Sequence, residues 1–138
     1  MATLDISDLS RLALDYEELA LLPDSVMDDA LRAGGAVLRE SVSREAASML
    51  SGPYSKGAVA ASATLTKPRV TKDGKAIYVT FEGSQHKTRI AEIAYINEYG
   101  KHNQAARQFV RTATEKCASE AVDAVEAIYN DYITRKGF

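Results

Sequence analysis

Few side chains in this chain could act as a nucleophile or a general base. The sequence contains one cysteine, Cys117, and two histidines, His86 and His102. Nucleophilic catalysis needs a serine or cysteine within reach of a base. Cys117 falls on the apolar face of a predicted helix, where a thiol behaves as a small buried hydrophobe with a raised pKa. His102 follows a predicted helix end and is expected to be solvated, so the sequence predicts no enzyme.

Metal and nucleotide sites also lack their usual patterns. Zinc is held by cysteine and histidine ligands at short, regular spacings, which the three such residues between positions 86 and 117 do not provide. A phosphate-binding loop needs spaced glycines followed by a Lys-Ser or Lys-Thr pair, whereas Ser55-Lys56-Gly57 has the wrong order. We therefore predict no cofactor.

The one charged set that the sequence suggests is Glu98 with Arg107 and Arg111. The chain reverses direction between them, so the carboxylate is expected near a guanidinium. A bidentate pair of this kind fixes the relative orientation of the segments that carry it. It could form within one chain or between subunits, and the alternative is three independent surface charges. In the paired arrangement Phe109 would bury its ring beside the charges.

These residues lie in a stretch, 90–116, that predicts two helices joined by a sharp turn. Ile90 and Ile93 begin an apolar pattern at helical spacing, and Gly100 follows where that helix would end. Glycine adopts the left-handed conformation at a helix C-terminus without a Cβ clash. A second helix is predicted from about Ala106 to Thr134.

The last helix has a wide apolar face. One row on it consists of Val110, Ala113, Cys117, Ala121, Ala124, Ile128 and Tyr132. A neighbouring row consists of Ala118, Val122, Val125, Tyr129 and Ile133. Together the rows cover about half of the helix circumference, more than one amphipathic contact requires. Either the helix lies between the hairpin and the other helices, or its C-terminal half packs on another copy of the chain.

Three further helices are predicted upstream, at Ser7 to Leu21, Ser25 to Leu50 and Ala58 to Ala63. Pro23 separates the first two, because it lacks an amide donor and clashes inside a helix. The second contains Gly34-Gly35, and each glycine costs about 1 kcal/mol relative to alanine. The pair indicates either a close helix crossing or a flexible hinge.

A β-hairpin is the clearest β signal in the chain. Thr64–Val70 and Ala76–Phe81 are rich in β-branched and aromatic residues and flank an Asp73-Gly74 turn. Pro68 cannot donate to the ladder, so the first strand is predicted to be an edge strand or to contain a bulge. Two strands alone are marginally stable. The hairpin must therefore pack on the helices or find further strands, in a neighbouring subunit or in residues 82–90.

Four cations, Lys67, Arg69, Lys72 and Lys75, bracket this hairpin. Alternate strand positions would place some of them on one face. The simplest interpretation is a solvated hairpin tip. The polar segment from Glu82 to Arg89 follows, and it is expected to be a loop of the kind that becomes ordered on assembly.

Composition restricts the class of protein. At 138 residues, with 46% hydrophobic and 26% charged residues, the chain suits one α+β domain with a single core. The expected architecture is long amphipathic helices packed on a small antiparallel sheet that includes the hairpin at about 64–81. The net charge of -2 argues against a general nucleic-acid binder, which needs many Lys and Arg contacts to phosphates. Neither a signal peptide nor a membrane span is indicated.

The stretch around the predicted turn resembles the neck proteins of tailed bacteriophages, the head–tail joining or tail-completion family. That family has a Glu-aromatic-Gly motif, a short polar loop and an Ala-Arg-Pro-Phe-Leu-Arg-like run. The matching residues of this chain are Ala94, Glu98, Tyr99, Gly100, Ala106, Arg107, Phe109, Arg111 and Ala113. Gln108 stands where the family usually has proline. The wider order of elements, from a long N-terminal helix through a hairpin to a C-terminal helix, is also similar.

The resemblance implies a structural subunit of a phage or prophage neck that forms a homo-oligomeric ring. Such a ring would join or complete the tail and contact the head connector and the tail tube or terminator. DNA would pass through it with only non-specific contacts, made by the four hairpin cations. The expected subunit surfaces are the wide apolar face of the last helix and the polar segment at 82–89. The candidate interface or motif residues are Glu98, Tyr99, Gly100, Arg107, Phe109 and Arg111, with Tyr129 and Ile133 from the apolar face. The protein would be found in the host cytoplasm during assembly and then in the virion, and the alternative is a DNA-associated regulatory protein that uses the basic hairpin.

Overall fold

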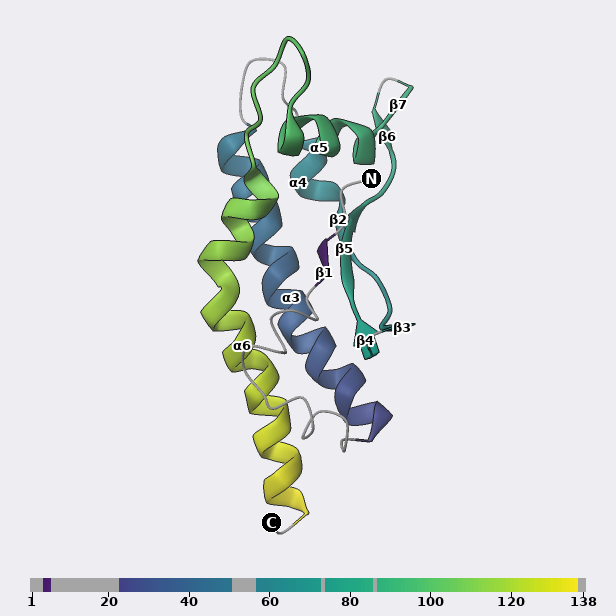
Figure 1. Ribbon diagram of the computed structural model, residues 1–138, viewed down its shortest axis with the longest axis vertical. Helices are drawn as coiled ribbons and strands as arrows, with labels where there is room; N and C mark the ends of the chain where they lie inside the picture. The colour runs from purple at the N-terminus through teal and green to yellow at the C-terminus, as the bar shows by residue number, and fades with distance from the viewer. Residues whose placement is uncertain (1–3, 6–22, 51–56, 73, 86, 137–138) are drawn as a thin grey trace.

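The computed structural model describes residues 4–5, 23–50, 57–72, 74–85 and 87–136. Its largest elements are two helices, α3 (Asp24–Met49) and α6 (Phe109–Arg135), which lie side by side and run in opposite directions (Figure 1). The predicted helix from Ser25 to Leu50 is thus confirmed. α6 begins three residues after the predicted Ala106. The helix predicted from Ser7 to Leu21 lies outside the described residues.

The contact between α3 and α6 combines large apolar side chains on one helix with small ones on the other. α3 contributes Leu38 and Val42 to the core, and α6 contributes Ala113 and Cys117; all four are buried. Burial of each large apolar side chain contributes about 1.5–3 kcal/mol. The Ser41 hydroxyl donates a hydrogen bond to the Ala113 C=O at 2.9 Å. The two helices are therefore joined by close packing and by a direct hydrogen bond.

A small antiparallel sheet lies on the other side of α3 (Figure 1), with strand order β1-β5-β2. Its strands are β1 (Leu4–Asp5), β2 (Ala63–Leu65) and β5 (Tyr78–Phe81). β3 (Arg69–Thr71) and β4 (Gly74–Ala76) pair with each other and continue the hairpin to its tip. The predicted hairpin is confirmed, and so is the predicted α+β fold of long helices packed on a small antiparallel sheet.

A bulge separates the two halves of the hairpin. The N–H of Thr66 donates to the C=O of Tyr78 at 2.8 Å. Beyond this pair, Lys67 and Pro68 lie opposite the single residue Ile77 before the ladder resumes in β3 and β4. An extra residue on one strand defines a bulge, and proline is accommodated there because it has no N–H to donate. The bulge predicted from Pro68 is confirmed, as is the edge position of β2.

Gly35 lets α3 approach the sheet closely. A Cβ at this position would lie 2.8 Å from Leu65 Cδ1 and 3.1 Å from Ile77 Cγ2. α3 continues through Gly34-Gly35 as an unbroken helix. Of the two interpretations of this pair, the structure therefore favours close packing over a hinge, and the partner of Gly35 is the sheet.

Two shorter helices, α4 (Ala58–Ser62) and α5 (Ile90–Tyr99), lie at the end of α3 where α6 begins (Figure 1). The short helix predicted at 58–63 is thus confirmed. Val59 of α4 and Ala94 of α5 belong to the same hydrophobic core as the residues of α3, α6 and β5. In the described part of the chain, no helix combines the length and apolar character that a membrane crossing requires.

The expectation of a loop from Glu82 to Arg89 is wrong. β6 (Ser84–Gln85) pairs antiparallel with β7 (Thr88–Arg89) in a short hairpin. Gly83, with φ of 94°, turns the chain into this hairpin, and its C=O accepts the N–H of Ile90 at 3.0 Å. The segment contains no apolar alternation that would have indicated strands.

Candidate functional site

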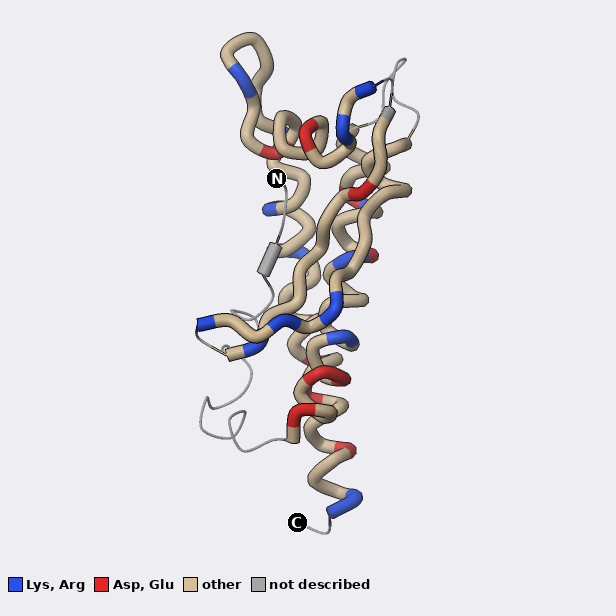
Figure 2. Tube along the Cα trace, turned by 90° about the vertical axis from the view of Figure 1, so that its right-hand side faces the viewer, with Lys and Arg blue, Asp and Glu red and all other residues tan. Residues whose placement is uncertain are grey.

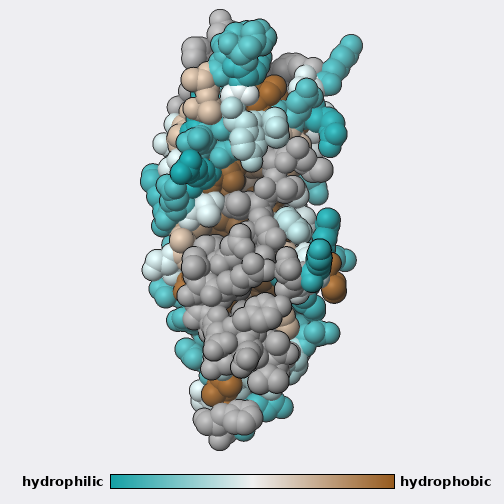
Figure 3. Space-filling model, viewed as in Figure 1, coloured by the Kyte–Doolittle hydropathy of each residue, from teal (hydrophilic) through white to brown (hydrophobic). Residues whose placement is uncertain are grey.

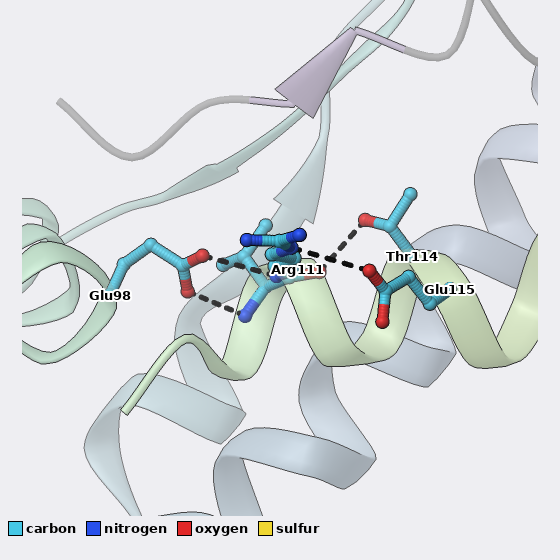
Figure 4. A network of polar contacts seen from close by, with 5 residues as sticks. Glu98, Arg111, Thr114 and Glu115 are labelled. Carbon is cyan, nitrogen blue, oxygen red and sulfur yellow. Dashed lines mark hydrogen bonds and ion pairs between the residues drawn. The ribbon is translucent and has the colours of Figure 1, made fainter. Parts of the chain in front are cut away.

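Glu98, in the last turn of α5, caps the N-terminus of α6 from outside that helix. Its Oε2 accepts the N–H of Val110 at 2.7 Å, and its Oε1 accepts the N–H of Arg111 at 3.1 Å (Figure 4). Amides in the first turn of a helix have no partner within it, and a carboxylate there also compensates the positive end of the helix dipole. Glu98 is 7% exposed, so water competes little for these bonds. The carboxylate therefore fixes α6 against α5.

The predicted pairing of Glu98 with a guanidinium is wrong within the chain. Arg111 pairs instead with Glu115 one turn along α6, with Nε and Oε1 3.2 Å apart (Figure 4). Arg107 has an exposed side chain, and its backbone N–H donates to the C=O of Asn97 at 2.7 Å. Both oxygens of Glu98 bind backbone amides, because these lie directly in front of the carboxylate and are otherwise unsatisfied.

The cap also explains why α6 begins later than predicted. Gln108, the residue before the helix, has φ of 48°, and its side chain makes no capping hydrogen bond. No Ser, Thr, Asp or Asn, the usual capping residues, occupies positions 104–108. The absence of a capping residue at these positions is the sequence signal that a residue from another element satisfies the first amides of α6. In the structure that residue is Glu98.

Gly100 makes the turn between α5 and α6. Its φ of 78° and ψ of 179° lie in a region that is essentially restricted to glycine. A Cβ at this position would also lie 2.8 Å from the Ala106 nitrogen and 2.8 Å from the Gln104 oxygen. The predicted helix end at Gly100 is confirmed, but its ψ of 179° differs from the left-handed helical conformation expected there. The absence of a side chain lets the returning segment, 104–106, pack directly on the turn.

Phe109 anchors the start of α6 in the core. It is 0% exposed, and its ring meets that of Phe81 edge-on with centroids 5.9 Å apart. It directly precedes the two amides that Glu98 binds. The predicted role of Phe109 as a buried anchor is confirmed, with the Glu98 cap in place of an ion pair beside it. We refer to Glu98, Gly100 and Phe109 together as the α5–α6 junction.

Tyr99 lies outside this junction, although it belongs to the same sequence motif. Its side chain is 64% exposed and packs at a tilt against that of Tyr95, with ring centroids 4.8 Å apart. Tyr95 also borders an open hollow together with Arg89, Ala91 and Glu92. The two rings therefore form an exposed aromatic patch on the outer face of α5.

Tyr129 and Ile133 lie on the part of α6 that extends past the core. The buried residues of α6 end at Val125, and both of these side chains are half-buried. Figure 3 shows an apolar patch, in brown, at the C-terminal end of α6. The C-terminal turns of α6 therefore keep apolar area at the surface.

Lys75 differs from the other cations of the hairpin. Its Nζ lies 2.8 Å from Asp28 Oδ1 and 3.7 Å from Asp24 Oδ1, both on α3. The hydrogen bond to Asp28, opposed in part by burial, raises the pKa of Lys75. Lys75 therefore ties the hairpin to α3. Its charge is neutralised within the chain and is not free for the DNA contact that the resemblance implied.

Several Lys and Arg residues lie along the hairpin (Figure 2). Among them, Lys67, Arg69 and Lys72 have exposed side chains. None of the three forms an ion pair with another described residue, although Arg69 lies over the Tyr78 ring, 5.9 Å from its centroid. Val70 stands among them and, at 83% exposure, is the most exposed large apolar side chain of the described residues. The hairpin tip thus presents positive charge around one apolar side chain.

Cys117 and His102, the candidate reactive side chains of the sequence, are a buried core residue and an exposed turn residue. Cys117 is 3% exposed, and burial raises the pKa of its thiol. Its predicted position in the core is confirmed. His102 is exposed in the turn after Gly100, as expected. Among the described residues, no three His, Cys, Asp or Glu side chains are grouped so as to hold a metal ion.

Comparison of the chain with protein-family models, with curated proteins and with solved structures finds no match. The resemblance to the phage neck family therefore stays a prediction from the sequence. The structure gives a physical role to three of the matching residues, Glu98, Gly100 and Phe109, because together they hold α5 and α6 in one fixed relation.

Proposed function

We propose that this protein is a structural subunit of a phage or prophage neck. Its copies would form a homo-oligomeric ring that joins or completes the tail at the head–tail interface and leaves a passage for DNA. The observation that supports the proposal best is the α5–α6 junction, because the residues that resemble the neck family fix the shape of the molecule there.

A ring closes only when the rotation between neighbouring subunits is constant, so each subunit must hold its surfaces at fixed angles. The Glu98 cap, the turn at Gly100 and the buried Phe109 ring each oppose a change of angle between α5 and α6. The junction therefore supplies the rigidity that a ring subunit needs.

A ring also needs two different surfaces on each subunit, one for each neighbour. α6 and the sheet lie on opposite sides of α3, to its left and right in Figure 1. The C-terminal end of α6 includes the half-buried Tyr129 and Ile133, and the sheet side includes the exposed Val70. Each side thus offers apolar surface to a neighbouring copy.

The exposed cations Lys67, Arg69 and Lys72 favour a second candidate function, a DNA-associated regulatory protein. This alternative predicts binding to bare duplex that weakens steeply as salt rises, since phosphate contacts release counterions. The ring proposal predicts little affinity for duplex in dilute solution, in keeping with the net charge of -2. Electrophoretic mobility shifts at low and high salt distinguish the two functions.

The double variant Tyr129→Asp, Ile133→Asp is expected to lose self-association while it keeps its fold. Carboxylates at positions 129 and 133 can reach water in the monomer but must be desolvated in a contact between copies. The midpoint concentration of assembly should rise more than about tenfold, which corresponds to about 1.4 kcal/mol. Size-exclusion chromatography with light scattering measures this shift over a range of protein concentrations.

The matched control is Asn130→Asp with Thr134→Asp, which adds the same charge at exposed positions on the same turns of α6. The control should assemble at least as well as the unchanged protein. Equal assembly of the Tyr129→Asp, Ile133→Asp variant, with its helical circular dichroism intact, would rule out this part of α6 as an interface.

A further inference from the structure

The tip of the β3–β4 hairpin and a stripe near the C-terminal end of α6 match in charge and in apolar content. We propose that the tip of one copy docks on the C-terminal half of α6 of the next copy, and that this repeated contact builds the ring. The inference rests on the proposed function, since it assigns the two surfaces through which neighbouring subunits meet.

The hairpin is tied to α3 next to its tip and presents one exposed apolar side chain. The ion pair of Lys75 with Asp28, at 2.8 Å, ties β4 to α3. On the partner strand Val70 points its side chain into solvent, at 83% exposure. Arg69 and Lys72 flank it as exposed cations without an acidic partner among the described residues. By strand alternation Arg69 points to the other face of β3 from Val70 and lies over the Tyr78 ring. An exposed apolar side chain with unpaired cations close to it in the chain is suited to an apolar surface that carries carboxylates.

A stripe near the C-terminal end of α6 provides such a surface. Glu126, Tyr129 and Ile133 follow one another at spacings of three and four residues, which places them on one side of the helix. All three are half-buried, and the exposed Asp123 precedes Glu126 by one turn. Neither carboxylate forms an ion pair with another described residue. The stripe therefore combines apolar area with two unpaired negative charges.

A second copy of this chain is the occupant that the geometry favours. The tip and the stripe lie on opposite sides of α3 (Figure 1), so they cannot meet within one molecule. Figure 3 shows brown, apolar atoms both at the hairpin tip and at the C-terminal end of α6. In the contact Val70 would bury its side chain against Tyr129 and Ile133. Because the two surfaces are unlike, the contact repeats from copy to copy and closes when the rotation allows.

DNA fits the same surfaces less well. It would attract Arg69 and Lys72, but a phosphate backbone offers no apolar surface to Val70. It would also be repelled by Asp123 and Glu126, which leaves the C-terminal stripe of α6 without a partner. A neighbouring copy satisfies both surfaces at once.

Charge reversal on each surface tests this contact. Arg69→Glu with Lys72→Glu makes the tip acidic, and Asp123→Lys with Glu126→Lys makes the stripe basic. Each double variant then opposes like charges at every contact between its own copies, so its midpoint concentration of assembly should rise more than about tenfold. An equimolar mixture of the two variants offers opposite charges at every contact between unlike copies. The mixture should therefore regain assembly, as should one chain that carries all four substitutions.

The control for the tip variant is Arg32→Glu with Lys101→Glu, which lowers the net charge by the same amount at exposed positions outside both surfaces and should assemble normally. Circular dichroism verifies that every variant is folded, and light scattering measures assembly. Recovery in the mixture and in the four-substitution chain would support direct contact between tip and stripe. Unchanged assembly of the two double variants, or no recovery in either combination, would overturn it.

The same measurements distinguish failure of the proposed ring from failure of the docking of tip on stripe. An unchanged protein that stays monomeric at every concentration would overturn the ring itself. A ring that forms regardless of these charges would overturn only the docking of tip on stripe. Duplex DNA binding that is lost in the Arg69→Glu, Lys72→Glu variant, with assembly unaffected, would also overturn the docking and would favour the DNA-associated function.

Discussion

Replacing Phe109 with alanine should destabilise the protein by about 3–5 kcal/mol, the cost typical of removing a large aromatic side chain from a core. Phe109 is 0% exposed and packs edge-on against Phe81, so the change leaves a cavity and removes an aromatic pair. A domain is stable by only about 5–15 kcal/mol, so this loss is a large fraction of the total. Urea denaturation followed by circular dichroism would show it as a lower midpoint at unchanged slope.

Tyr99→Ala is the matched control for this prediction, because Tyr99 is also aromatic and belongs to the same motif but is 64% exposed. Its effect on the free energy of unfolding should stay within about 0.5 kcal/mol. Phe109→Leu should fall between the two, since leucine refills part of the space. If Phe109→Ala were as mild as Tyr99→Ala, the ring would not anchor the α5–α6 junction.

Glu98→Ala should cost about 2–4 kcal/mol. Hydrogen bonds to a charged group contribute about 1.5–3 kcal/mol each, and the change removes two of them at a buried helix end. It also removes the charge that faces the helix dipole. The urea midpoint reports the total loss. Amide hydrogen exchange should show faster exchange at Val110 and Arg111 than elsewhere in α6.

Two further variants separate the cap from a general charge effect. Glu92→Ala removes an exposed carboxylate from the same helix and should cost less than about 1 kcal/mol. Glu98→Gln keeps the shape, but its NH₂ group faces a backbone N–H, so only one of the two bonds can survive. A Glu98→Ala variant no less stable than Glu92→Ala would refute the assignment of Glu98 as the cap.

Features with a local physical cause could be predicted from the sequence. Pro68 required a bulge or an edge because it has no N–H, and the bulge lies directly beside it. Gly100 marked the end of α5 because only glycine tolerates the conformation found there. The close approach at Gly35 likewise follows from the missing side chain. Each of these predictions depended on one residue and its immediate neighbours.

The partner of Glu98 could not be predicted in the same way. The chain reversal brings the carboxylate near the start of α6, where both the guanidinium of Arg111 and two free backbone amides were available to it. The sequence predicts that Glu98 pairs with a guanidinium of opposite charge, whereas in the structure its carboxylate accepts hydrogen bonds from the two backbone amides. That choice depends on the position of the helix axis relative to α5, which no local pattern encodes.

Of the two interpretations of the wide apolar face of α6, the first is wrong, because α3 lies between α6 and the sheet (Figure 1). Ala113 and Cys117 belong to the core, and Ala118 and Val122 pack against it. Tyr129 and Ile133 belong to neither group, and their contact with another copy stays a prediction. The periodicity predicts the width of the face, but it does not identify the elements that cover it.

Electron microscopy of the purified protein in negative stain tests most directly whether this chain is a ring subunit. The proposal predicts closed rings of uniform size with an open centre, which disappear when Tyr129 and Ile133 are both replaced by aspartate. A field of single compact particles, at concentrations up to the limit of solubility and with the protein fully folded, would contradict it.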